Sequence, residues 1–113
     1  MQFVTFELNS VPFSILNGGP IHAQHTPSTS HVVHCKDQTE VDYYWSKLGE
    51  GADDSEFVCG WLKDKFGISW QVVPVQLMQM LLSEDKEKAG KATMAMMGMK
   101  KFDVEALEAA FDG

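Results

Sequence analysis

The sequence is poor in cysteine and in basic residues, and it holds no long apolar run. Two cysteines are too few for a disulfide framework and suit a reducing cytoplasm. Nine Lys and Arg against sixteen Asp and Glu leave a net charge of −7, which repels phosphate backbones. No apolar stretch approaches the length that spans a bilayer, and residues 1–5 lack the basic start of a signal peptide. We therefore expect a cytoplasmic protein that binds neither nucleic acid nor membrane.

Motifs for covalent and cofactor chemistry are also missing. The chain has no Gly-x-Ser-x-Gly motif, no phosphate-cradling glycine loop and no dinucleotide fingerprint. Cys59 is predicted on a strand with no basic neighbour to activate its thiol, and Cys35 is expected to be structural. A chain of 113 residues allows one domain with a core of its own. No cofactor is predicted.

An alternation of apolar and polar side chains predicts a β-hairpin over residues 3–16. The first strand carries Val4, Phe6 and Leu8, and the second carries Val11, Phe13 and Ile15. Asn and Ser at residues 9–10 supply the turn between them. The Asn-Gly-Gly-Pro run at residues 17–20 ends the hairpin, and a polar loop is expected over residues 20–30.

A strand near residues 30–35 and a helix are predicted next. Asp37 followed by Glu40 forms a capping box, and Gly49 fits the C-terminal cap. Apolar residues then recur at helical spacing, namely Val41, Tyr44, Trp45 and Leu48. Two further strands are predicted within CGWLKDKFGISWQVVP at residues 59–74, joined by a charged turn and ended by a proline.

The pattern after residue 74 is helical. One apolar segment covers residues 75–82, Ser83 is expected to cap a second helix to about Met99, and Asp103 to cap a third. The third helix carries Val104, Leu107, Ala110 and Phe111 at helical spacing. Four methionines lie together, Met94, Met96, Met97 and Met99, and they are expected to fill core gaps or a subunit interface rather than a ligand groove.

The run at residues 59–74 resembles the signature of the PhnB-like proteins, the "3-demethylubiquinone 3-methyltransferase domain" family. This family belongs to the vicinal oxygen chelate superfamily, with glyoxalase I, bleomycin-resistance proteins and extradiol dioxygenases. Residues 16–20, 40–48 and 99–103 extend the resemblance. The chain offers no Rossmann-type glycine turn to support the methyltransferase label.

The resemblance implies an α+β fold in a single domain over residues 1–113. Superfamily members curl two βαβββ modules into a cup. Residues 3–16 would be the last two strands of module one, residues 30–74 module two, and residues 75–113 a helical tail. The strand-helix-strand that opens the family pattern is lacking, so the cup is expected to be incomplete.

Metal ligands in the superfamily are His and Glu on the first and last strands of the modules. The resemblance puts the remaining positions near Ser14, Ser30 and Gln71, whose side chains are poor ligands for a divalent metal. No metal site is therefore predicted. Four histidines lie between residues 22 and 34. On a strand, His31 and His34 would point to opposite faces and could not share an ion.

A cup-shaped pocket is predicted instead, with His34 as either an acid–base group or a hydrogen-bonded structural residue. The expected ligand-binding residues are Ser14, Leu16, Ser30, His34, Trp61, Ser69 and Gln71. Trp70 is expected to pack beneath the helix. The predicted function is metal-independent binding of a small organic ligand that the sequence does not name.

Two alternatives stay open. One is a metal-dependent glyoxalase- or dioxygenase-type enzyme whose site a partner chain or a missing module completes. The other is a relic that folds only as an oligomer. Because an incomplete cup leaves an unpaired strand edge and an uncovered apolar face, we expect a two-fold homodimer, built by edge pairing or strand exchange.

Overall fold

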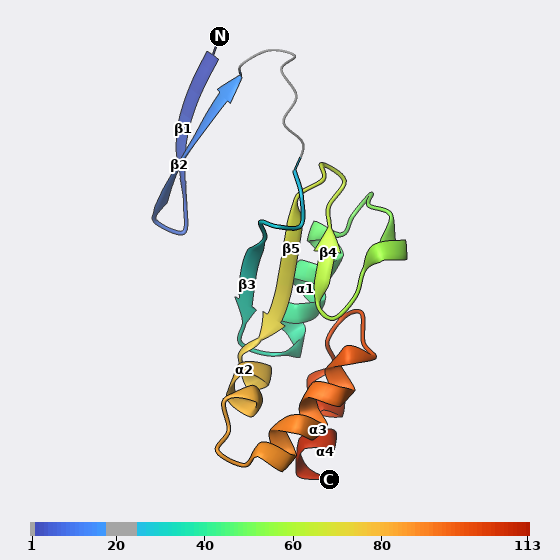
Figure 1. Ribbon diagram of the computed structural model, residues 1–113. Helices are drawn as coiled ribbons and strands as arrows, with labels where there is room; N and C mark the ends of the chain where they lie inside the picture. Colours follow the sequence, from blue (N-terminus) through green and yellow to red (C-terminus); the bar gives the residue numbers. More distant parts are fainter. Residues whose placement is uncertain (1, 18–24) are drawn as a thin grey trace.

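The computed structural model describes residues 2–17 and 25–113, which form two small sheets and a group of helices (Figure 1). The strands are β1 (Gln2–Leu8), β2 (Val11–Asn17), β3 (His31–Cys35), β4 (Trp61–Lys63) and β5 (Ser69–Pro74). The helices are α1 (Gln38–Leu48), the short 3₁₀ helix η1 (Asp54–Glu56), α2 (Val75–Leu81), α3 (Lys86–Met97) and α4 (Val104–Asp112). The α+β class and the helical tail are confirmed. The predicted stop at residues 18–20 and His22 lie outside the described residues.

The predicted hairpin is confirmed as an antiparallel β1–β2 pair. Leu8 pairs with Val11 around a two-residue turn, in which Asn9 and Ser10 have φ angles of 50° and 65°. Two positive φ angles are typical of the type I′ turn, whose twist suits a tight hairpin. The hairpin stands away from the other elements, at the end of the molecule opposite the C-terminus (Figure 1).

The second sheet has the strand order β3-β5-β4. β3 runs parallel to β5, while β4 is antiparallel to it. The crossover between β3 and the rest of the sheet contains α1, which covers one face of the sheet (Figure 1). The core between them consists of Cys35, Val41, Phe57, Leu62 and Val72. This arrangement leaves the opposite face of the sheet free of α1.

The caps of α1 follow the sequence pattern closely. The Asp37 carboxylate accepts a hydrogen bond from the Glu40 backbone N–H at 2.9 Å, and Gly49 is the C-terminal cap. The Glu40 carboxylate in turn accepts from the backbone N–H of Lys36 at 2.9 Å. The reciprocal bond of the capping box is therefore made one residue earlier than expected.

The residues before β4 depart from the prediction. Cys59 and Gly60 do not lie on a strand but form a tight turn with φ angles of 50° and 78°. Val58 and Trp61 face each other across this turn and exchange two backbone hydrogen bonds. The strand prediction for Cys59 was wrong because a two-residue turn of this type needs positive φ angles, which the apolar pattern does not reveal.

The helical tail packs at the far end of the β3-β5-β4 sheet. Its core joins the end of β5 to all three tail helices, through Val73, Leu77, Met80, Ala92, Phe102 and Leu107. Asp103 caps α4 as predicted, but Asp85, not Ser83, caps α3. Met96 and Met99 pack against this core, whereas Met94 and Met97 are exposed. In the described part of the chain, no helix is long and apolar enough to cross a membrane.

Candidate functional site

The face of the β3-β5-β4 sheet opposite α1 carries a row of side chains of mixed chemistry. The strand register aligns Val32 and Trp61 on either side of Gln71. Lys63 lies opposite Ser69 in the same register. The neighbouring positions Leu62, Trp70 and Val72 point to the α1 side, where they join or pack against its core. The prediction that Trp70 packs beneath the helix is confirmed.

Ser30 and Gln71 are joined by a hydrogen bond on this open face. The Gln71 side-chain amide donates to the Ser30 hydroxyl at 2.9 Å, and both side chains are partly buried. The parallel pairing of β3 with β5 brings together these two residues, which lie 41 positions apart. The pair fixes the orientation of the amide near the middle of the sheet.

A cavity of about 710 Å³ opens beside this face, at the β4 edge of the sheet. Its lining consists of His25, Pro27, Glu56, Val58, Cys59, Trp61, Leu62, Lys63 and Ser69. The volume falls within the range of small-molecule sites, and apolar walls with a few polar groups are typical of them. Lys63 and Glu56 form an ion pair at 3.3 Å, and both side chains are largely exposed.

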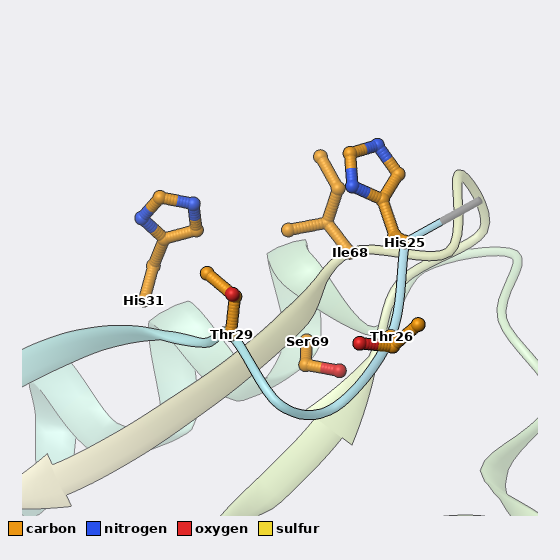
Figure 2. A pocket seen from close by; sticks show the side chains of 6 residues that line it. All are labelled: His25, Thr26, Thr29, His31, Ile68 and Ser69. Carbon is orange, nitrogen blue, oxygen red and sulfur yellow. The ribbon is translucent and has the colours of Figure 1, made fainter. Parts of the chain in front are cut away.

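A smaller cavity of about 240 Å³ shares His25 and Ser69 with the larger one. Its lining also includes Thr26, Thr29, His31 and Ile68 (Figure 2). Figure 2 shows the two threonines on either side of Ser69. Ser69 is 6% exposed and lines both cavities. It is the polar group best placed to hold a bound molecule.

His34 is on the open face but not in either cavity. It pairs with Val73, whose side chain belongs to the core of the tail. Val73 lies four residues along β5 from Ser69, a distance of roughly 13 Å on a strand. His31 points the other way, with its ring 5.1 Å from that of Trp70. The two histidines therefore lie on opposite faces, as their spacing predicts.

Ser14 and Leu16 are the predicted site residues that the fold keeps apart from the others. They pair with Thr5 and Phe3 on one face of the hairpin. The hairpin stands away from the β3-β5-β4 sheet (Figure 1). Within one chain, these two residues do not join the Ser30–Gln71 pair.

Several cavity residues were missed by the sequence analysis. Val58 and Cys59 enter the lining because the turn at residues 59–60 folds the chain back beside β4. A Cys-Gly pair between two apolar residues is the signal that could have marked this turn. His25, Pro27 and Glu56 come from loops or short turns, where no periodic pattern exists to place them.

The Cys35 thiol lies in the core beneath α1 and is not an activated nucleophile. Burial, followed by the nearby charges of Glu40 and Asp37, raises the pKa of Cys35 to about 11. This thiol is therefore protonated at neutral pH and is a poor nucleophile. The Cys59 thiol donates to the backbone carbonyl of Met97 at 3.6 Å. Both cysteines are free.

The residues at the expected metal positions do not fit a divalent metal. The Ser30 hydroxyl and the Gln71 amide bond to each other, and neither group is a strong ligand for such an ion. Ser14 lies on the separate hairpin. Over residues 2–17 and 25–113, no three His, Cys, Asp or Glu side chains gather closely enough to hold a metal ion.

The family model described as 3-demethylubiquinone-9 3-methyltransferase matches residues 1–73. The matched span runs from the hairpin almost to the end of β5, so it includes every residue that lines the two cavities. The helical tail follows it. No curated protein matches the chain.

Proposed function

This chain belongs to the 3-demethylubiquinone-9 3-methyltransferase family, a PhnB-like branch of the glyoxalase-type superfamily, and we propose that it is a small-molecule binding protein. The observation that carries the proposal is the cavity of about 710 Å³ beside the open face of the β3-β5-β4 sheet. It is large enough for a small organic molecule. The binding is proposed to need no metal ion and no other cofactor.

The lining of the cavity favours an uncharged ligand with a flat face. Val58 and Trp61 supply apolar and aromatic surface, on which a planar molecule can stack. The Ser69 hydroxyl lies at the floor, where it can hydrogen-bond one polar group of the ligand. An anionic ligand is disfavoured because the chain carries a net charge of −7 and Lys63 is already paired with Glu56.

The chain is proposed to act in the cytoplasm, as a single domain over residues 1–113 and as a homodimer. The two free cysteines suit a reducing compartment. An apolar surface on the hairpin, which includes Val4, Phe13 and Ile15, is exposed within one chain and needs a partner. The metal-independent function does not depend on the dimer, because the lining of the cavity comes from one chain.

A second candidate is a metal-dependent enzyme of the glyoxalase or dioxygenase type, completed by a partner chain. Its support is His34, an exposed imidazole on the open face of the sheet. A ligand set for this enzyme would need further His or Glu side chains from another molecule. Metal analysis of the purified protein separates the two candidates. Stoichiometric bound metal would favour the enzyme and contradict the binding protein.

The binding test uses a panel of uncharged planar molecules that includes 1-naphthol, with affinity read by titration calorimetry. We expect wild-type protein to bind at least one of them and Trp61→Ala to weaken that binding at least tenfold. Phe66→Ala is the matched control, because Phe66 is an exposed aromatic residue outside the lining of the cavity. Binding that Trp61→Ala leaves unchanged would contradict the proposed site.

A further inference from the structure

Over residues 4–8 and 11–15, one face of the β1–β2 hairpin carries only apolar side chains. Three cross-strand pairs form it, Val4 with Ile15, Phe6 with Phe13, and Leu8 with Val11. The Phe6 and Phe13 rings stack at the centre, with their centroids 5.6 Å apart. We call these six residues the apolar hairpin face. The opposite face is mixed, with Phe3 paired to Leu16, Thr5 to Ser14 and Glu7 to Pro12.

The apolar hairpin face is exposed to solvent. Five of its side chains are 37–57% exposed, and only Phe6 is partly buried. By contrast, α1 covers the apolar face of the β3-β5-β4 sheet. The radius of gyration, 16.8 Å, exceeds the ~13 Å of a compact domain of this length, as the outlying hairpin requires. A two-stranded hairpin is marginally stable in water unless its apolar face packs against something.

Charge points to a second copy of this chain as the partner. Of the nine basic and sixteen acidic residues, only Glu7 lies in residues 2–17, and its pairing with Pro12 puts it on the mixed face. Each copy carries a net charge of −7, so a contact through other surfaces of the chain would bring acidic groups together. At the apolar hairpin face two copies can meet without opposing any charge.

The size of the face is consistent with a specific contact. Six side chains of this kind, about half exposed, bury on the order of 1,000 Å² in total when two copies meet, which reaches the lower limit of specific interfaces. Pairing along the β2 edge is less favourable, because Pro12 has no N–H to donate to a neighbouring strand. The β1 edge has no proline, but a strand added there would leave the apolar hairpin face in water, so the face is the better surface.

We propose that two copies associate hairpin on hairpin through the apolar hairpin face, around a two-fold axis near the Phe6–Phe13 pair. This inference rests on the homodimer of the proposed function and names its interface. The two hairpins would stack as a small β-sandwich with about 10 Å between its sheets. The mixed faces, which carry Ser14 and Leu16, would then lie on the outside of the sandwich.

The test is sedimentation velocity at micromolar concentration on wild type, Phe13→Glu and Thr5→Glu. We expect wild type to be a dimer and Phe13→Glu to be a monomer, with dimer affinity at least 100-fold lower, because two carboxylates would face each other. Thr5→Glu adds the same charge to the mixed face and should remain a dimer. All three tryptophans lie outside the hairpin, so their fluorescence checks that the rest of the chain of Phe13→Glu is folded.

Cross-linking of introduced thiols gives a second measurement. In a Cys59→Ser background, Phe6→Cys is expected to be joined into a dimer by a short bismaleimide that can span the roughly 10 Å between the two sheets, while Thr5→Cys is not. A monomeric wild type, or a dimer that Phe13→Glu leaves intact, would overturn the proposal. So would a dimer that Met94→Glu dissociates while Phe13→Glu does not, since that result assigns the contact to the exposed methionines of α3.

The same samples separate this proposal from the binding function. If monomeric Phe13→Glu still binds the planar probe, the interface is supported and the cavity works within one chain. If wild type is a dimer of the expected kind but binds none of the probes, the interface stands and the proposed function fails.

Discussion

The Gln38 side chain accepts a hydrogen bond from the backbone N–H of Val104 at 2.7 Å. Its amide also donates to the backbone carbonyl of Phe102 at 2.9 Å. Gln38 is the first residue of α1, and Val104 is the first of α4. One side chain therefore satisfies a donor at the start of α4 and an acceptor just before it. This contact ties the helical tail to the helix that covers the sheet.

Gln38→Ala should destabilise the protein by about 1–3 kcal/mol, because it leaves the partly buried Val104 N–H and Phe102 carbonyl without their partner. Urea denaturation followed by tryptophan fluorescence measures the change. Gln79→Ala, an exposed glutamine on α2, serves as the control and should stay within about 0.5 kcal/mol of wild type. Equal effects of the two variants would contradict the tie between α1 and the tail.

Gly60→Ala should be more damaging than Gly67→Ala. Both glycines have positive φ angles, 78° and 89°, which an alanine adopts at a cost of about 1 kcal/mol. A Cβ atom at Gly60 would also overlap the Phe102 ring, whereas the space around Gly67 is open. We expect a loss of about 2–4 kcal/mol for Gly60→Ala and about 1 kcal/mol for Gly67→Ala in urea denaturation. Similar losses would show that the tail does not press on this turn.

Trp70→Ala should cost about 3–5 kcal/mol, because the indole packs against the α1 core and donates to the Asp64 carboxylate at 2.9 Å. Gln71→Ala should change stability little, by about 0.5 kcal/mol, and alter ligand binding instead, because Gln71 lies beside Trp61 on the open face. Ser14→Ala, on the separate hairpin, should change neither stability nor ligand binding. Thermal unfolding and ligand titration on the same samples provide both readings. A large stability loss in Gln71→Ala would mean that its amide stabilises the sheet rather than binding a ligand.

Asp64 should make the protein less stable in acid. Burial by itself raises the pKa of its carboxyl, but hydrogen bonds from the Trp70 indole and from the backbone of Ile68, Phe66 and Gly67 together lower it below 3.8. Since the folded-state pKa is the lower one, this stabilisation is present above pH 3.8 and is lost as the pH falls through the folded-state value.

The measurement is the midpoint of urea unfolding between pH 7 and pH 2 for wild type and Asp64→Asn. Asp42 and Asp53 also have lowered pKa values, so wild type should lose stability in the same acidic range through three carboxylates. Asp64→Asn should show a shallower loss below about pH 4. Parallel curves for the two proteins would show that the Asp64 hydrogen bonds do not favour the ionised form.

Local patterns were enough to predict most secondary structure. The capping pair Asp37 and Glu40 and the terminal Gly49 mark α1 because helix ends are recognised within one turn of the chain. The strand alternation of residues 3–16 likewise predicts a hairpin without knowledge of the rest of the fold. The start of α3 was misplaced because Ser83 and Asp85 are both acceptable caps, and it is the Asp85 carboxylate that accepts from the Lys88 backbone N–H.

The candidate site was only partly predictable. The alternation of side chains along the two strands predicts that Ser30 and Gln71 point to the same face of the sheet. Only the parallel pairing makes these two residues, 41 positions apart, neighbours. The part of the cavity formed by Val58 and Cys59 depends on a turn with two positive φ angles. An apolar pattern contains no information on such angles.

The sequence by itself therefore determined which segments form helices or strands and which side chains share one face of a strand. The periods of 2.0 and 3.6 residues that mark them depend only on neighbouring positions. Tertiary structure decided the rest. Contacts between distant residues closed the cavity around Trp61, tied α4 to Gln38 and left the apolar hairpin face exposed. Such contacts depend on how whole elements pack, and no local pattern encodes that packing.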